Sequence, residues 1–229
     1  MTARGLLSLG ALLALSPTSG QAARQAAISA ESLLQRSGAV VQVRITEVDP
    51  FAGHGWPATR VRYVIERRIG GGPPGEVGDF LLPEGIESDG MTWSGYAGVP
   101  EFSPGEAYLL FLRHAPWYIS PITHWRAGHL RQVDVAGRTL YVGGDGACVV
   151  DWGETLRFGP RVVDPPPSPG RGAVWSPTPP TPSAAAACLP AHRLRTRLRR
   201  QMHRLGWRPR PVPATPIDGR PVFETAEVP

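Results

Sequence analysis

Glycine and proline interrupt this chain along most of its length, with 27 Gly and 26 Pro among 229 residues. Glycine loses much conformational freedom in a regular element, and proline lacks the N–H group that helices and sheets use. Both residues occur here more often than in average soluble proteins. The composition therefore predicts short strands joined by many turns rather than long helices.

Alternating hydrophobicity marks the expected strands. The runs 39–48 and 59–69 alternate apolar and polar side chains, as half-buried strands do. The run 107–112 (AYLLFL) is apolar nearly throughout, which is typical of a strand buried on both faces. Further strands are expected at 76–82, 91–93, 117–122, 130–135 and 138–142. Without convincing helices between them, these strands predict a mainly β fold, an antiparallel barrel or sandwich.

The first 22 residues resemble a secretory leader. Arg4 gives a basic start, the run 6–15 is apolar, and Gly20, Gln21 and Ala22 form a small-residue cleavage site. We expect a mature chain that begins near Ala23 and is secreted or periplasmic. The apolar run of about ten residues is too short to span a bilayer, which takes about 20. No transmembrane segment is predicted.

Composition divides the rest of the chain into four parts. A β-barrel domain is predicted over 26–160, opening with a short helix at 26–36. A Pro-rich linker over 161–187 cannot bury enough apolar surface to form a core. A basic amphipathic helix over 188–206 and a disordered tail over 207–229 follow.

The formal net charge of +5 is concentrated near the C-terminus. Residues 1–160 hold 13 Arg against 15 acids, and residues 161–229 hold 11 Arg against 4 acids. Affinity for an acidic partner is therefore expected only in the last quarter of the chain. The chain has no Lys, which indicates a coding bias, so arginine content alone is weak evidence for phosphate recognition.

The predicted basic helix has an apolar stripe, because Leu194, Leu198, Met202 and Leu205 recur at spacings of four, four and three residues. Its basic patch consists of Arg193, Arg195, Arg197, Arg199, Arg200 and Arg204. We favour packing of the stripe on the barrel, ahead of binding to an anionic membrane or polymer. Specific recognition of nucleic acid is the least favoured alternative.

Cys148 and Cys188 are the only cysteines. An even number of cysteines in an exported chain predicts a disulfide between them, with two unrelated buried thiols as the alternative. Neither cysteine belongs to a CxxC pair, so they do not predict a metal site.

Catalytic and cofactor motifs are missing from the sequence. There is no GxSxG elbow, no HExxH pair and no GK[ST] phosphate loop. His124 and His129 lie five residues apart, a spacing that matches no zinc helix. The sequence therefore predicts no catalytic residue, no metal ligand and no cofactor.

Aromatic and basic residues gather in the irregular central region. The aromatic members are Trp93, Tyr96, Trp117, Tyr118 and Trp125. The basic members beside them are Arg113, His114, His124 and Arg126. Aromatic side chains with arginine are typical of protein interfaces, although large rings also close the ends of β-barrels, which we favour. The five aromatic residues are taken as a provisional contact surface.

Four motifs carry a resemblance to a known kind of module. They are VVQVRITEV at 40–48, VRYVIERRIGG at 61–71, GEV at 75–77 and FSPGEAYLLFL at 102–112. With them, the segment 39–112 resembles a module of exported bacterial proteins of unassigned function. Such modules resemble the barrel of tissue inhibitors of metalloproteinases and the netrin module, which implies a five-stranded OB-like fold.

The same resemblance does not carry the inhibitor mechanism to this chain. That family blocks zinc proteases with a cysteine at the mature N-terminus, where Ala23 is expected here. The sequence as a whole favours an exported, non-enzymatic binding protein whose partner is a protein or an anionic envelope component. A protease-associated inhibitor or accessory domain is one alternative, and a hydrolase with an unrecognised site is another.

Overall fold

The computed structural model describes residues 28–51, 58–71, 77–82, 84–86, 92–94, 99–114, 121–164 and 182–212. The predicted leader lies outside these ranges. So does most of the predicted strand 117–122, of which Ile122 forms an isolated bridge to Leu112.

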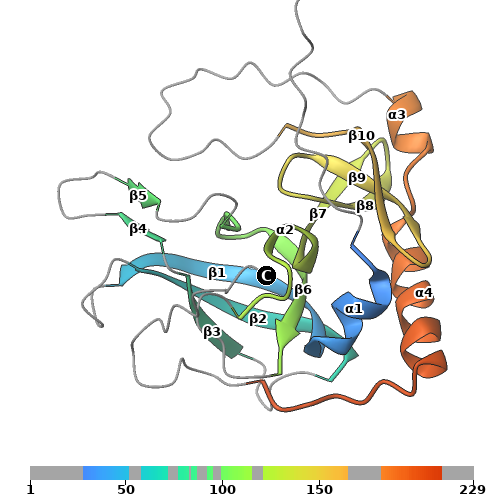
Figure 1. Ribbon diagram of the computed structural model, residues 1–229. Helices are drawn as coiled ribbons and strands as arrows, with labels where there is room; N and C mark the ends of the chain where they lie inside the picture. Colours follow the sequence, from blue (N-terminus) through green and yellow to red (C-terminus); the bar gives the residue numbers. More distant parts are fainter. Residues whose placement is uncertain are drawn as a thin grey trace, which may run out of the picture.

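An eight-stranded antiparallel sheet dominates the fold, in the order β10-β9-β8-β7-β6-β1-β2-β3 (Figure 1). Its strands are β1 (Ser37–Phe51), β2 (Ala58–Gly70), β3 (Val77–Leu82), β6 (Ala107–Arg113), β7 (His129–Val135), β8 (Arg138–Val142), β9 (Ala147–Trp152) and β10 (Leu156–Arg161). A separate pair is formed by β4 (Glu84–Ile86) and β5 (Thr92–Ser94). The prediction of a mainly β, antiparallel fold is confirmed.

The sheet is open, so the predicted closed barrel is wrong for the described residues. A barrel requires its first and last strands to pair, whereas β3 and β10 stand at opposite ends of the strand order. The chain adds the β9–β10 hairpin beside β8 instead of returning to β3. Pro160 in β10 has no N–H group to donate and suits an edge strand.

Strands β1 and β2 are longer than the glycine and proline content predicts, with 15 and 13 residues. Residues 39–49 contain neither glycine nor proline, so neither residue interrupts β1 there. Register shifts at three points, between Val40 and Val41, Gln42 and Val43, and Ile45 and Glu47, mark bulges in the ladder. Bulges bend and twist a long strand pair, which lets it follow the core.

Two predicted turns are present. Ala136 and Gly137 both have positive φ, at 50° and 73°, and connect β7 to β8 as a two-residue hairpin loop. Gly105 has φ 85° in the turn before β6, where the Glu106 N–H donates to the Ser103 carbonyl at 3.2 Å. Glycine occupies that left-handed conformation without a steric penalty.

The core has two main layers, one on each face of β1 and β6. Val40, Leu109 and Phe111 belong to a cluster shared with the helices. Val41 and Leu110 belong to the cluster on the opposite face. All the residues of β6 except the last are buried, as the apolar run predicts.

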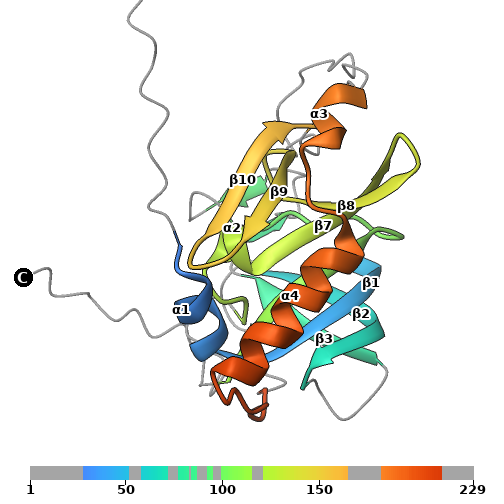
Figure 2. The same ribbon diagram turned by 90° about the vertical axis from the view of Figure 1, so that its right-hand side faces the viewer.

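The helices are α1 (Ala30–Gln35), α2 (Trp125–Gly128), α3 (Pro182–Ala186) and α4 (Ala191–Arg204). Ser29 caps α1, since its Oγ accepts from the Ser32 N–H at 3.2 Å. Helix α4 lies across one face of the sheet, against β2, β8 and β9 (Figure 2). Gly206 (φ 58°) ends it, and the Trp207 N–H donates to the Met202 carbonyl at 2.8 Å, as in a Schellman motif.

The predicted linker is structured at both ends. Val162 is buried, and its N–H donates to the Gly146 carbonyl at 3.0 Å. The other end forms helix α3, whose Ala185 is buried. The run 182–187 is rich in alanine, which has the highest helix propensity, although the Pro-rich sequence before it predicts no helix.

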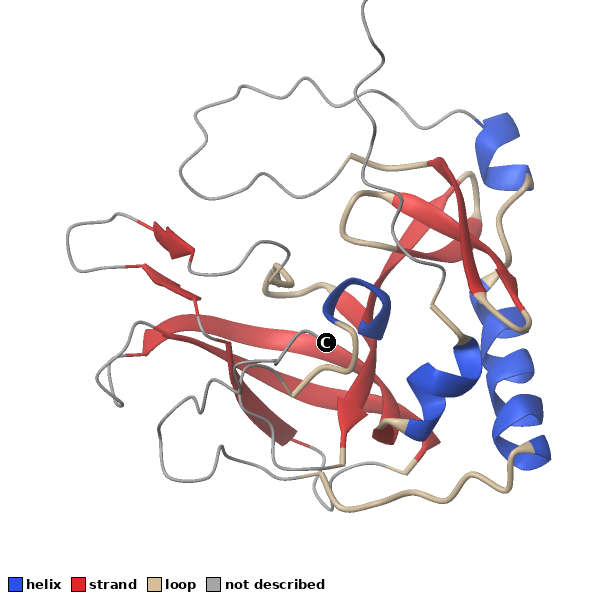
Figure 3. Cartoon of the chain, viewed as in Figure 1, coloured by secondary structure: helices blue, strands red, loops and turns tan. Residues whose placement is uncertain are grey.

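The beginning of the predicted disordered tail also packs on the sheet. Segment 207–212 leaves the end of α4 as a loop (Figure 3). The Arg210 N–H donates to the Gly38 carbonyl at 2.9 Å. Glycines let the segment approach closely: a Cβ at Gly70 would lie 2.8 Å from Trp207 Cζ3, and one at Gly71 would lie 2.5 Å from Pro209 Cβ. This packing depends on residues far away in sequence, which the local composition does not reveal.

Candidate anion-binding surface on helix α4

The apolar side of α4 faces the core. Leu194 and Leu198 are fully buried and Met202 is 6% exposed, all in the cluster that α1, β6 and β9 share. Leu205, at 37% exposed, does not continue this stripe. The structure therefore agrees with packing of the stripe, and it leaves little apolar surface on α4 for insertion into a membrane.

Polar contacts hold α4 in one register on the sheet. The Trp152 Nε1–H donates to Oε1 of Gln201, and both side chains are buried. The Arg195 Nη1 donates to the Tyr141 hydroxyl at 3.1 Å, which in turn donates to Gln42 Oε1 at 3.2 Å. Burial raises the pKa of Tyr141, and the Arg195 guanidinium acts in the opposite direction. These contacts connect α4 to β9, β8 and β1.

A disulfide fixes the start of α4. Cys148 of β9 and Cys188 are joined, as predicted, with their Cα atoms 5.8 Å apart. The Leu189 N–H donates to the Val149 carbonyl at 2.8 Å. The Arg138 guanidinium donates to the Cys188 carbonyl at 3.0 Å. The chain entering α4 is thus held to β8 and β9 by covalent and hydrogen bonds.

Four arginines form a row on the solvent side of α4. Arg193, Arg197, Arg200 and Arg204 follow one another at spacings of four, three and four residues, so they lie along one side of the helix. All four are exposed. With a rise of 1.5 Å per residue, the row is about 16 Å long. We call these four residues the arginine row.

Most of the arginine row is not neutralised by the described residues. Arg197 forms an ion pair with Asp151 of β9, and both side chains are about 40% exposed (Arg197 44%, Asp151 40%). Such surface pairs contribute little stability and exchange partners readily. No described acid pairs with Arg193, Arg200 or Arg204.

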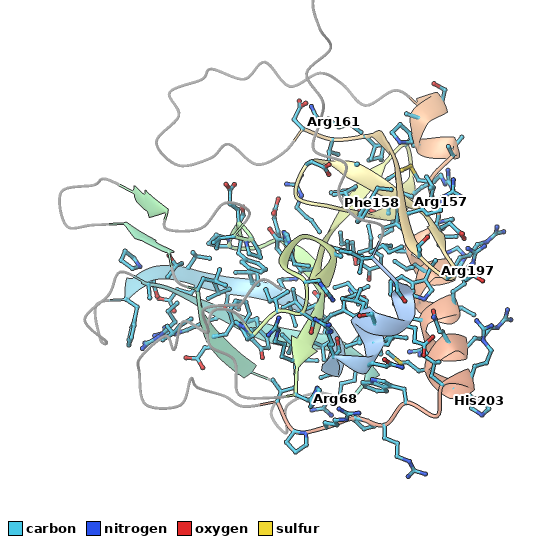
Figure 4. The ribbon with its side chains drawn as sticks, viewed as in Figure 1. Arg68, Arg157, Phe158, Arg161, Arg197 and His203 are labelled. Carbon is cyan, nitrogen blue, oxygen red and sulfur yellow. A yellow bond between two sulfur atoms is a disulfide. The ribbon has the colours of Figure 1, made fainter. Side chains whose placement is uncertain are left out.

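Further arginines extend the basic surface on both sides of the row. Arg157 of β10 is paired in register with Asp151 and lies on the same side of the molecule as Arg197, whereas Arg161 lies at the upper end of β10 (Figure 4). On the other side of α4, Arg67 is close enough to lower the pKa of Tyr141. An open hollow of about 280 Å³ lies there, lined by residues 65–68.

Sequence reasoning missed Arg157 and Arg161 because it did not predict β9 and β10. Gly159 and Pro160 interrupt the alternation in β10, which hides the strand. The apolar run of β9 (ACVVDW) was the signal that could have indicated it.

The predicted aromatic contact surface falls largely outside the described part of the chain. Trp93 lies in β5 and Trp125 in α2, but their side chains are not described. Tyr96, Trp117 and Tyr118 lie wholly outside it. This surface stays a prediction.

Among the residues that the structure describes, no group of three or more His, Cys, Asp or Glu residues could hold a metal ion. No helix in the same ranges has both the length and the apolar character that a membrane crossing needs.

Comparison of the chain with protein-family models, curated proteins and solved structures gave no match. The α4 surface is therefore interpreted from its own residues. Its arrangement suits the binding of several negative charges in a line, since arginine donates to phosphate and carboxylate oxygens in a bidentate manner.

Proposed function

We propose that this chain is an exported, non-enzymatic binding protein whose arginine row binds a linear polyanion of the cell envelope. The observation that carries the proposal is that the two sides of α4 have different environments. Its apolar stripe is buried in the core, while its four-arginine row faces solvent.

Export is supported by the leader-like first 22 residues and by the Cys148–Cys188 disulfide. Disulfides form and persist mainly in oxidising compartments outside the cytoplasm. N-terminal sequencing of secreted material should therefore return a sequence that starts at or near Ala23, and recovery of Met1 would contradict export with cleavage.

A polymer is a better partner than a membrane for two reasons. A helix that lies on a membrane inserts its apolar side, and here Leu194 and Leu198 are fully buried. Successive arginines of the row are also separated by roughly 4.5–6 Å along the helix axis, as the helical rise dictates. A flexible chain with closely spaced negative groups can contact several of them at once.

Binding of the mature protein to inorganic polyphosphate, a linear polyanion, tests the proposal. We expect saturable binding that weakens steeply between about 50 and 200 mM salt, because released counterions drive the association. Replacing two unpaired arginines of the row (Arg193→Gln with Arg200→Gln) should weaken binding roughly tenfold and flatten the salt dependence.

A matched control changes the net charge equally at a distant place. Arg60→Gln with Arg62→Gln removes two arginines at the far end of β2, where they face Asp79 and Glu47. This control should bind polyphosphate nearly as well as the wild type. Equal losses in both double variants, or binding to anionic lipid vesicles alone, would overturn the proposal.

A further inference from the structure

A second basic cluster lies away from the arginine row, where α1 and β6 end. Arg36 is the residue that ends α1, Arg113 is the last residue of β6, and His124 immediately precedes α2. Strand β1 pairs with β6 so that Ser37 lies opposite Arg113, and Arg36, which precedes Ser37, therefore lies close to Arg113. The Thr123 N–H donates to the Phe111 carbonyl at 2.8 Å, which places His124 beside the end of β6.

Two nitrogens of this cluster are buried without a hydrogen-bond partner. They are Nε of Arg113 and Nε2 of His124. Among the described residues, only Arg60 Nε is in the same state. Buried polar groups in native proteins are nearly always paired, so two such atoms on neighbouring side chains call for an explanation.

The charges around both groups are positive. Burial and the Arg36 charge lower the pKa of Arg113. Burial, then Arg36, then Arg113 lower the pKa of His124. The sequence has no Asp or Glu between Glu106 and Asp134, so no acid is close along the chain either. Arg36 and Arg113, whose charges repel each other, thus lie beside a histidine whose protonation they oppose, and no ion pair joins either arginine to a described carboxylate.

The backbone at His124 is strained. Its φ of 50° and ψ of 53° are left-handed, which is uncommon for a residue other than glycine. The following turn is closed so tightly that a Cβ at Gly128 would lie 1.8 Å from the Thr123 carbonyl oxygen. Strain of this kind persists only where the surroundings enforce it, and it is concentrated at functional sites.

His114 fixes the surroundings of the cluster. Arg210 Nη1 lies 2.7 Å from His114 Nε2, and His114 Nδ1 lies 3.1 Å from the Arg36 carbonyl oxygen. Because arginine can only donate, Nε2 accepts and Nδ1 carries the proton that the carbonyl accepts. His114 therefore connects segment 207–212 to the end of α1.

We propose that Arg36, Arg113 and His124 form a binding site for one oxyanion group, a carboxylate or a phosphate. A single anion there would offset the repulsion and accept hydrogen bonds from both unpartnered nitrogens. Arg36 is exposed, and Arg113 and His124 are half-buried, so an anion can approach from solvent. Because both nitrogens are covered, the proposal requires the Arg113 and His124 side chains to rotate when the anion binds. This site does not depend on the arginine row.

Titration of the mature protein with inorganic phosphate and, separately, with acetate tests the site at low ionic strength. The readout is the NMR signal of the His124 ring. We expect a saturable shift of this signal, a rise in the His124 pKa, and at least a tenfold loss of affinity in Arg113→Gln. Response to phosphate alone identifies a phosphate site, and response to acetate alone identifies a carboxylate site.

Controls separate this site from general charge effects and from the arginine row. Arg157→Gln on β10 removes the same charge elsewhere and should leave the titration unchanged. Arg36→Gln, at an exposed position, replaces Arg113→Gln if the latter does not fold. The Arg193→Gln, Arg200→Gln double variant should keep the His124 response even if polyphosphate binding fails. A non-saturable shift, or equal losses in Arg157→Gln and the site variants, would overturn the proposal.

Discussion

The Tyr141 hydroxyl accepts a hydrogen bond from Arg195 Nη1 at 3.1 Å, so a fully buried residue of β8 is held by an arginine of the basic helix. Arg195 thus serves the fold, although it belongs to the same predicted patch as the exposed arginines. Helix α4 consequently has one side that packs on the sheet and another side for which we propose anion binding, and the two sides can be tested separately.

The structural side depends on Leu198. Replacing Leu198, which is fully buried, with Ala should lower the free energy of unfolding by about 2–5 kcal/mol, because the change leaves a cavity. Denaturant titration measures this loss, and polyphosphate binding at native conditions should persist. Leu205→Ala, at a 37% exposed position, is the control and should have a much smaller effect. Unchanged stability in Leu198→Ala together with lost liposome binding would identify α4 as a membrane element.

The disulfide should be a major source of stability. Cys148 and Cys188 are 40 positions apart, and closing a loop of that length stabilises a fold by about 4 kcal/mol in chain-entropy terms. The Cys148→Ala, Cys188→Ala double variant should therefore unfold at a clearly lower urea concentration. Peptide mapping without reduction should recover the linked peptides, whereas two alkylatable thiols in the oxidised, folded protein would exclude the bond.

Trp207 should hold segment 207–212 on the body of the protein. Its Nε1 atom lies 2.8 Å from the Leu34 carbonyl oxygen and 3.2 Å from that of Ser37, and its ring packs on the helix-side core. For this half-buried ring, Trp207→Ala should cost about 2–3 kcal/mol, less than for a fully buried tryptophan. Thermal unfolding measures the change beside Arg208→Ala, an exposed neighbour. Identical midpoints for the two variants would show that the segment contributes nothing.

Acid should destabilise the protein partly through His124. Burial, Arg36 and Arg113 lower the pKa of His124 from its ordinary value of 6.5, so the unfolded chain binds this proton more readily than the folded chain. His124 therefore costs the folded state no stability above pH 6.5, and the free energy of unfolding decreases as the pH falls below that value. Urea midpoints at pH 7.5 and pH 5 should fall further in the wild type than in His124→Gln. Equal decreases of the urea midpoint in the wild type and in His124→Gln would show that another group is responsible.

The sequence predicts the parts of the fold that local patterns encode. Alternation locates β1 and β2, and the apolar run locates β6. These patterns arise because the side chains on one face of a strand share the same degree of burial. The pattern fails at β10, where Gly159 and Pro160 interrupt it. Closure of the sheet depends on which distant strands pair, and no local pattern decides that.

The same distinction applies to the candidate sites. The arginine row is predictable from the sequence, because helical periodicity alone places Arg193 and Arg197 on one side. The cluster of Arg36, Arg113 and His124 is not, because pairing of β1 with β6 assembles it from three separate segments. The basic residues at 113 and 124 were visible in the sequence, but only beside aromatic residues whose contacts are not described.

The contact between Trp207 and Leu34 also constrains the order in which the protein can mature. It joins residues 173 positions apart, so the beginning of the sheet receives its cover only after almost the whole chain has been synthesised. Contacts of such long range form late, because the intervening chain has to be ordered first. A nascent chain can therefore pair all eight strands of the sheet once residue 161 is available, whereas the end of α1 stays without this cover until Trp207 has been added. The cover over the end of α1 is thus among the last parts of the described fold that the growing chain can complete.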